Sequence, residues 1–434
     1  MVDREGKLCL VMTRVLGSVL ALALAATGPV QAKVRTHPAK APHQASAPTP
    51  AVQNSTTASA PQKPNTPPAE ARLIEILKLI AAGQTKTALT QAQSLVEDVP
   101  TFHLGQLVYA DLLTARTQKI STMGAAPGGL SALAPQRLEQ LRTEAERRLA
   151  ASRERPPTGA LPAQFIELPP STKHAIAVDA TRSRLYLFEN GPKGLQLVAD
   201  HYASVGRLGT EKSSEGDQRT PLGVYYITSR LEGRQLTDFY GSGALLLNYP
   251  NEHDRRQGRT GSGIWLHGVP SDSYSRSPNS TDGCVALANP ELRAILERVQ
   301  PRTTPVVIAR SIQWVQPTLN EQDRRNVHNL IEGWRMARVS GDVNRLMSFY
   351  SPQFSNGAYD FMQWRVAVTK EVGQQRARSF QLKDLAILGW KDKSDLLVVT
   401  FGEVADGQRA GAVKRQYWGK EGGLWKIFYE GVIG

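Results

Sequence analysis

The sequence predicts a multidomain protein with an N-terminal α-helical module, a mostly-β middle domain and a C-terminal α+β domain. Apolar residues recur with helical spacing between residues 70 and 160 and alternate as in strands between residues 173 and 310. Between residues 319 and 434 the helical pattern comes first and the strand pattern follows. The 434 residues, 41% of them hydrophobic, provide enough apolar side chains for about two or three separate cores.

The chain begins with the features of a secretion signal. Basic residues precede an apolar run at residues 15–26, and the small-residue sequence Val30-Gln31-Ala32 fits a cleavage site. We therefore expect residues 1–32 to be a Sec-type signal peptide, with an uncleaved N-terminal anchor as the alternative. Residues 33–69 are rich in Pro, Ala, Ser and Thr, which predicts a disordered linker. No later apolar run predicts a stable membrane span.

The next region, residues 70–160, has the periodicity of paired helices. It resembles a tetratricopeptide-type helical hairpin, but it holds too few repeats to be stable alone. We therefore expect a docking or dimerisation module, with a homodimer as one consequence. Three apolar helices and one charged helix are expected at residues 73–80, 88–96, 104–113 and 135–153.

The middle region consists of short alternating runs separated by Gly and Pro, which predicts a mostly-β domain over residues 173–310. Asn190-Gly191 is typical of a tight hairpin turn between two of its strands. Strands are expected at residues 174–179, 184–188, 195–202, 223–228, 244–247, 264–267 and 304–308, and a helix at residues 290–299.

The C-terminal region, residues 319–434, places helices before a run of strands, an order that resembles the NTF2-like cone. Its aromatic residues fall at helical and strand periods, so most of them should be core. No acid–base pair in it indicates a second enzyme. Helices are expected at residues 322–339, 343–350 and 359–372, and strands at residues 380–388, 396–403, 412–418 and 424–429.

The charge of the chain points to an anionic surface and away from nucleic acid. The formal net charge is +13, and the basic residues are spread along the sequence. A diffuse positive field suits an anionic envelope surface. No basic stripe interleaved with aromatic residues predicts a nucleic-acid partner.

Cys284 is the main candidate for chemistry. Of the two cysteines, Cys9 lies in the expected signal peptide, so the mature chain cannot form an internal disulfide. A lone thiol in an oxidising compartment is a buried bystander, an intermolecular staple or a nucleophile. A nucleophilic thiol needs a base, because only a few per cent of it is thiolate at neutral pH. His267, at the end of an expected strand, is the candidate base.

These residues occur in an order that resembles a known family. His267-Gly268 followed by Gly283-Cys284 resembles the HG…(S/T)xGC signature of the YkuD-type L,D-transpeptidases. Ser204-Val205-Gly206 and the sequence TPLGVY at residues 220–225 resemble two further segments of that family. The resemblance covers about residues 173–310. Together with the flanking regions, it matches the layout of the periplasmic cell-shape L,D-carboxypeptidase subgroup.

The resemblance implies an enzyme that acts on peptidoglycan stem peptides in the periplasm and needs no metal or organic cofactor. Cys284 would attack meso-diaminopimelate at its L-centre, form a thioester and release D-Ala, while His267 takes the thiol proton. The Gly268 carbonyl would orient the imidazole, and the N–H groups of Asp282, Gly283 and Cys284 would form an oxyanion hole. Transfer to water would make the protein an L,D-carboxypeptidase, whereas transfer to a diaminopimelate amine would make it an L,D-transpeptidase.

Two departures from the family pattern bear on the reaction. The commoner members carry His just before the Gly-Cys pair and Arg two positions after the Cys, where this chain has Asp282 and Ala286. The missing cation leaves open how a substrate carboxylate is held, and Asp282 on its own would raise the pKa of the thiol. A catalytically inactive wall-binding scaffold and a hydrolase of a protein–peptidoglycan linkage are the alternative functions.

Five residues near the signature are candidates for contacts with substrate. Trp265 is expected on the strand face opposite to His267, where core packing would explain it as well. Arg276 is either a solvated loop charge or the partner of a substrate carboxylate. The complete set is Arg259, Trp265, Arg276, Ser280 and Thr281.

A second histidine offers a different interpretation of the thiol. We expect His253 to be exposed beside Asp254, although it could also form the rim of the cleft. Zinc binding by Cys284, His267 and His253 is an alternative, but no CxxC or HxxH spacing supports it.

Overall fold

The computed structural model describes residues 67–124, 135–317, 321–374, 379–392 and 395–433. Cys9, the expected signal peptide and nearly all of the expected linker lie outside these residues. All described residues belong to one compact unit, residues 59–434. None of the helices in the described ranges is long and apolar enough to cross a membrane.

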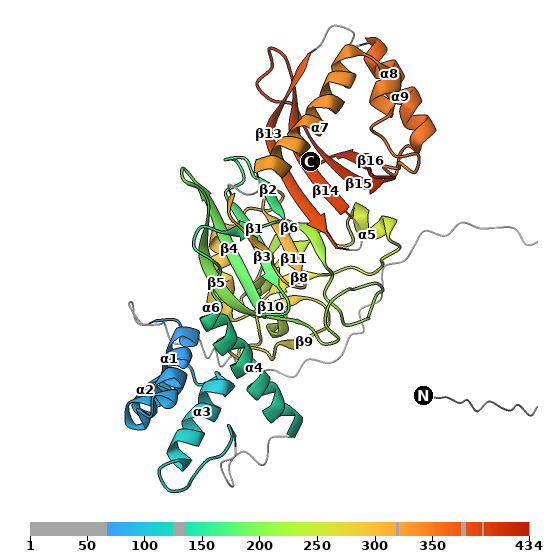
Figure 1. Ribbon diagram of the computed structural model, residues 1–434. Coiled ribbons are helices and arrows are strands. Elements are labelled where there is room, and N and C mark those ends of the chain that lie inside the picture. The colour runs from blue at the N-terminus through green and yellow to red at the C-terminus, as the bar shows by residue number, and fades with distance from the viewer. Residues whose placement is uncertain (1–66, 125–134, 318–320, 375–378, 393–394, 434) are drawn as a thin grey trace, which may run out of the picture. The chain divides into compact units, whose positions relative to one another are not determined.

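The N-terminal region is helical, as its periodicity predicts. Leu73, Ile76 and Leu95 are fully buried in its core, and helix α1 ends before Gly83, whose φ of 74° is a left-handed conformation that stops a helix. Tyr274 and Ala288 of the middle domain belong to the same apolar cluster. The helices therefore pack partly on the chain's own middle domain. They are α1 (Ala69–Ala81), α2 (Thr85–Asp98), α3 (His103–Thr114) and α4 (Pro135–Arg153) (Figure 1).

The middle domain is built on a nine-stranded sheet with the order β10-β8-β7-β6-β11-β3-β4-β5-β9. Strand β10, at one end of this order, also pairs with β5, which lies next to β9 at the other end. The expected strands and the expected helix are present. The elements are β3 (His174–Asp179), β4 (Arg184–Gly191), β5 (Gly194–Gly206), β6 (Gly223–Glu232), β7 (Gly243–Leu247), α5 (Glu252–Arg256), β8 (Trp265–His267), β9 (Asn279–Thr281), β10 (Val285–Leu287), α6 (Asn289–Arg298) and β11 (Pro305–Ala309). Two short 3-10 helices, Gly233–Gln235 and Asp238–Tyr240, lie between β6 and β7.

The hairpin of β4 and β5 forms, but its turn is not at Asn190-Gly191. Gly191 pairs with Gly194, so the turn consists of Pro192 and Lys193. Proline has no N–H to donate to the ladder, and its φ is preset for a turn. The strand therefore ends at Gly191, directly before Pro192.

The C-terminal domain is an α+β domain in which helix α7 lies against an antiparallel sheet (Figure 1). Trp334 of α7 packs with Phe401 and Trp418 of the sheet, and all three side chains are fully buried. The sheet order is β16-β15-β14-β13-β2. The elements are α7 (Glu321–Ser340), α8 (Val343–Met347), α9 (Phe361–Gln374), β13 (Phe380–Lys391), β14 (Asp395–Ala405), β15 (Ala412–Glu421) and β16 (Leu424–Val432).

A short segment before the middle domain contributes two strands that pair with later parts of the chain. No sequence pattern predicted them. Strand β2 (Phe165–Glu167) adds to the C-terminal sheet beside β13. Strand β1 (Leu161–Pro162) pairs with β12 (Trp314–Val315), which follows the middle domain. These strands are too short to show a period, and their partners are distant in sequence.

Candidate active site

Two neighbouring strands place Cys284 and His267 on one face of the sheet. Strands β10 and β8 run parallel with Ala286 opposite His267, and Cys284, immediately before β10, lies beside Trp265, whose N–H donates to its sulfur at 3.4 Å. Side chains two positions apart point to the same face. A strand spacing of about 4.8 Å and a rise of about 3.3 Å per residue separate the two Cα atoms by about 8 Å. Within the described residues no hydrogen bond joins the thiol to the imidazole.

The imidazole of His267 is held by the backbone of the next residue. Its Nδ1 lies 2.6 Å from the carbonyl oxygen of Gly268. A carbonyl can only accept, so Nδ1 carries the proton and the lone pair of Nε2 is left to act as a base. His267 is only 1% exposed, and this burial lowers its pKa to about 4, with the positive charge of Arg276 acting in the same direction.

Asn289, which no sequence motif singled out, supports the turn at Gly268. Its side-chain oxygen accepts hydrogen bonds from the N–H groups of Ser242 (2.9 Å) and Val269 (3.3 Å), and its amide donates to the Val269 carbonyl (2.8 Å). A Cβ on Gly268 would collide with this side chain and would lie 3.0 Å from the Tyr240 carbonyl oxygen. The site therefore requires glycine at position 268.

The thiol of Cys284 has two backbone neighbours. It accepts a hydrogen bond from the Trp265 N–H and donates to the Gly263 carbonyl, each at 3.4 Å. Burial raises its pKa and Asp282 raises it further, whereas the Trp265 N–H, Arg276 and Lys212 oppose the rise. At neutral pH the thiol and the imidazole are therefore both uncharged, so the thiol proton has to move during the reaction.

The turn before Cys284 is fixed by Thr281. The Thr281 hydroxyl donates to the Cys284 carbonyl at 2.6 Å and accepts from the Gly283 N–H at 3.2 Å. Gly283 has a φ of 127°, and a Cβ there would lie 2.7 Å from the Arg219 carbonyl oxygen. Thr281 is 2% exposed, so its hydroxyl holds the turn. One of the three expected oxyanion donors, the Gly283 N–H, already has a partner.

Arg276, in the loop that follows Gly268, lies over the ring of Phe239. Its guanidinium carbon lies 4.3 Å from the centre of the Phe239 ring, and that ring is 6.0 Å from the imidazole of His267. Its charge lowers the pKa of both His267 and Cys284. Arg276 as a whole is half-buried.

Trp265 does not lie on the face opposite to His267, and that expectation was wrong. The two residues are two positions apart in β8, and such residues share a face of a strand. The ring of Tyr240 contacts both of them, at 4.8 Å from Trp265 and 5.2 Å from His267. Trp265 is half-buried beside the thiol.

The other candidate substrate residues are engaged with the protein. The Ser280 hydroxyl donates to the Ser277 carbonyl at 3.0 Å and contacts the Ser204 hydroxyl at 3.1 Å. Arg259 forms an ion pair with Asp254 at 2.8 Å. No contact between described residues links Arg259 to the thiol or to the imidazole.

Asp282, next to the nucleophile candidate, is exposed and contacts Arg207 and Gln218. Its carboxylate lies 3.5 Å from the guanidinium of Arg207 and accepts a 3.4 Å hydrogen bond from Gln218. The side chain is 67% exposed, so water and Arg207 screen the effect of its charge on the thiol.

His253 is buried, which contradicts the expected exposure. Helix α5 turns it inward, 6.2 Å from the ring of Phe428 in β16, and only 7% of the residue is exposed. Burial and the charges of Arg259 and Arg256 lower its pKa to about 4. Within the described residues no group of three or more His, Cys, Asp or Glu side chains is arranged to hold a metal ion.

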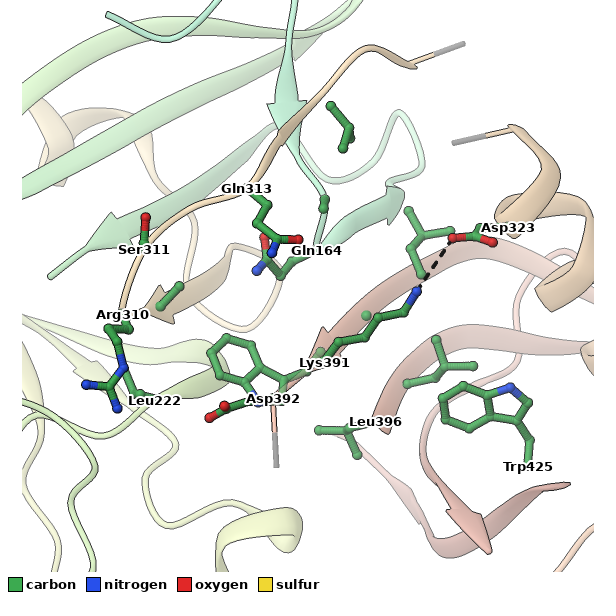
Figure 2. Close-up of a pocket in the computed structure, with 17 residues that line it drawn as sticks. Gln164, Leu222, Arg310, Ser311, Gln313, Asp323, Lys391, Asp392, Leu396 and Trp425 are labelled. Carbon is green, nitrogen blue, oxygen red and sulfur yellow. Dashed lines mark ion pairs between the residues drawn. The ribbon is translucent and has the colours of Figure 1, made fainter. Parts of the chain in front are cut away.

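A separate cavity of about 490 Å³ lies between the middle and C-terminal domains (Figure 2). Gln164, Gln313 and Arg310 border it on one side, and Lys391 and Trp425 border it on the other. Neither Cys284 nor His267 lines it, so it is not the site of the thiol chemistry.

Comparisons with solved structures identify proteins of similar fold. The structure of Bd1075 from Bdellovibrio bacteriovorus shares 25% sequence identity with a TM-score of 0.55, covering 63% of this chain and 98% of that chain. The helical cell shape determining protein Pgp2 from Campylobacter jejuni shares 23% identity with a TM-score of 0.48, covering 59% of this chain and 91% of Pgp2. A point mutant of Pgp2 shares 22% identity with a TM-score of 0.49, covering 66% of this chain and 97% of the mutant chain.

Comparisons with protein families assign the two larger domains. No curated protein sequence matches the chain significantly. Residues 173–308 match the YkuD L,D-transpeptidase catalytic domain, and residues 326–431 match the Cds6 C-terminal NTF2-like domain. The chain therefore combines a helical N-terminal region with a β-rich catalytic domain of the YkuD L,D-transpeptidase family and a C-terminal NTF2-like domain of the Cds6 type.

Proposed function

We propose that this protein cleaves peptidoglycan stem peptides through a thioester on Cys284. The observation that carries the proposal is the shared face of β8 and β10, which presents the thiol and the free Nε2 of His267 to one substrate. Their Cα separation of about 8 Å allows the side chains to approach each other when substrate binds. Hydrogen bonds between catalytic groups are often long before substrate arrives.

The reaction follows from the two uncharged groups. As sulfur attacks the carbonyl carbon at the L-centre of meso-diaminopimelate, the S–C bond forms and the thiol proton passes to Nε2 of His267. Collapse of the tetrahedral intermediate breaks the C–N bond, and the imidazolium returns that proton to the amine of the departing D-Ala. His267 Nε2 then takes a proton from the attacking acceptor, the new bond to the carbonyl carbon forms as the C–S bond breaks, and the imidazolium returns the proton to sulfur to restore the thiol.

The oxyanion of the intermediate needs donors at the turn before Cys284. We assign this role to the N–H groups of Asp282, Gly283 and Cys284, the residues of the turn that leads to the sulfur. The Gly283 N–H would exchange its 3.2 Å bond to Thr281 for the oxyanion. A bond of that length between neutral groups is weak, so the exchange is not costly.

Arg276 is our candidate for binding the substrate carboxylate. It provides a cation beside the thiol in a chain that has Ala286 where commoner members carry arginine. The guanidinium can form two parallel hydrogen bonds to a carboxylate, and the face of Phe239 holds its other side. We propose water as the acceptor of the acyl group, which makes the reaction an L,D-carboxypeptidase trimming of tetrapeptide stems.

Purified sacculi incubated with the enzyme test this assignment by mass spectrometry of the released muropeptides. Tripeptide stems and free D-Ala are the expected products. New crosslinks between two diaminopimelate residues would instead establish transpeptidation and contradict water as the acceptor. Unchanged sacculi would favour a wall-binding scaffold without catalysis, and release of a wall-linked protein would favour a hydrolase of that linkage.

A peptidoglycan substrate places the protein in the periplasm, to which the expected signal peptide would direct it. A homodimer through the N-terminal helices stays a prediction. Analytical ultracentrifugation of the mature chain distinguishes a dimer from a monomer.

A further inference from the structure

The loop that carries Arg276 connects the two halves of the candidate active site. It begins at Gly268, directly after β8, and ends at strand β9, which runs from Asn279 to Thr281 and is followed by the turn to Cys284. The position of Arg276 relative to the thiol therefore depends on what holds this loop. In the described structure, Tyr202, Ser204 and Val205 of β5 hold its backbone, and helix α4 of the N-terminal region holds its side chains.

Three consecutive residues of the loop are tied to α4. The Ser275 hydroxyl donates to Glu144 at 2.8 Å. The Ser277 hydroxyl lies 3.3 Å from both Gln140 and Arg137.

The third contact is indirect and holds the backbone of Arg276. The hydroxyl of Tyr202 donates to the Arg276 carbonyl at 3.0 Å. The guanidinium carbon of Arg148, also on α4, lies 3.8 Å from the centre of the Tyr202 ring. Helix α4 therefore bonds directly to Ser275 and Ser277, and it contacts the Tyr202 ring whose hydroxyl holds the Arg276 backbone.

The alternation of side chains along this extended segment explains the geometry. Ser275 and Ser277 point to α4 and are buried, at 9% and 3% exposure. Arg276, between them, points the other way, over Phe239. The helix thus holds both neighbours of Arg276, while its guanidinium lies over Phe239, a ring 6.0 Å from the imidazole of His267.

The anchor on α4 is itself rigid. Glu144, which receives Ser275, also accepts two hydrogen bonds from Arg148, at 3.0 and 2.8 Å, and both side chains are 2% exposed. Arg148 donates in addition to Glu70 of helix α1 at 2.8 Å. Buried, fully paired charges have one well-defined arrangement, because leaving either partner unpaired is strongly unfavourable.

The first half of the loop is held by the same helical region. The Tyr274 N–H donates to the Thr101 carbonyl at 3.1 Å, and the Tyr274 ring lies 4.5 Å from that of Phe102. Thr101 and Phe102 form the turn between α2 and α3. The helical region thus contacts the loop on both sides of Ser275.

We propose that the N-terminal helical region is part of substrate recognition in this enzyme, because helix α4 positions Arg276 to bind the C-terminal carboxylate of the stem peptide. Glu144, Gln140 and Arg137 are positioning residues that act through the loop and do not touch substrate. The inference rests on the proposed function, since it assigns a task to Arg276 in that reaction.

The test uses variants that loosen the loop without disturbing the buried charges. Ser275→Ala removes one hydrogen bond while Arg148 still satisfies Glu144, and the double variant Arg137→Ala/Gln140→Ala removes the other attachment. Gln140→Glu keeps an acceptor oxygen for Ser277 and should behave as wild type. Glu139→Gln, on the same helix with a 69% exposed side chain, is the matched control.

Two substrates separate carboxylate recognition from general damage. Full-length variants are assayed on a tetrapeptide muropeptide with a free C-terminal carboxylate and on the same peptide ending in an amide. We expect KM for the free acid to rise about three- to tenfold, the range produced by one or two lost hydrogen bonds, with little change in kcat. The amide should be hardly affected, as in Arg276→Ala. An equal loss on both substrates would overturn the proposal.

A second measurement needs no turnover. The rate at which iodoacetamide alkylates Cys284 as a function of pH reports the pKa of the thiol. Misplacing Arg276 should shift this profile to higher pH in the loosened variants and in Arg276→Ala, but not in Glu139→Gln. If the variants show this shift but the wild-type protein turns over no stem peptide, the result would contradict the proposed function alone. Loosened variants with unchanged profiles and unchanged substrate selectivity would refute the positioning role.

Discussion

Acidification should destabilise the catalytic domain because His267 is buried as a neutral imidazole. In the folded protein burial lowers its pKa from 6.5 to about 4. Between these values the unfolded chain binds a proton at this position and the folded chain does not. Stability from His267 is therefore complete above pH 6.5 and is lost progressively as the pH falls towards 4.

The magnitude follows from the difference in proton affinity. Each tenfold change in affinity corresponds to about 1.4 kcal/mol, so the full loss below pH 4 is about 3 kcal/mol. Between pH 7.5 and pH 5 the loss is about 2 kcal/mol, because at pH 5 the unfolded imidazole is almost fully protonated and the folded one is not.

The assay is urea unfolding of wild-type protein and of His267→Gln at pH 7.5 and pH 5. Glutamine does not titrate, so the stability difference between the two proteins should shift by about 2 kcal/mol in favour of the variant at pH 5. His253, whose pKa is also lowered to about 4, is present in both proteins and cancels in the subtraction. A difference that stays constant with pH would refute the buried, neutral imidazole.

Two further substitutions test how the backbone shapes the site. Asn289→Ala removes three hydrogen bonds to the turn around Gly268. We expect a stability loss of about 2–3 kcal/mol in denaturant unfolding and a lower kcat for D-Ala release. Unchanged kinetics would contradict the support of the turn by Asn289. Gly283→Ala forces a φ of 127° on a residue with a Cβ and places that Cβ 2.7 Å from the Arg219 carbonyl oxygen. We expect backbone strain to lower the stability by about 1–3 kcal/mol and D-Ala release to be almost completely lost. Wild-type activity in this variant would show that the turn tolerates a side chain.

Local sequence patterns predicted the elements of the structure well. Helix α4 begins and ends at the expected residues, because its apolar spacing and its prolines are local signals. The turn at Pro192 was missed by two residues, since the Asn190-Gly191 signal competes with a proline that cannot continue a strand. Strand β2 has three residues and a distant partner, so nothing local predicts its place in the C-terminal sheet.

Several features of the candidate site depend on contacts between distant parts of the chain, which sequence patterns do not predict. The motif gave Cys284 and His267 as a pair, but their shared face follows from the parallel register of β8 and β10, which no spacing reveals. The burial of His253 depends on Phe428, more than a hundred residues away in sequence, whereas its charged neighbours suggested exposure. The support of Arg276 by α4 is equally non-local, because helix and loop are far apart in the chain.

The enzymatic proposal is tested most directly by the mass of the intact protein after mixing with a tetrapeptide muropeptide and rapid acid quenching. We expect a species heavier than the free enzyme by the mass of the muropeptide less D-Ala, with the added mass on the peptide that contains Cys284. Cys284→Ala should show neither this adduct nor any release of D-Ala. Release of D-Ala by Cys284→Ala at the wild-type rate would contradict the account.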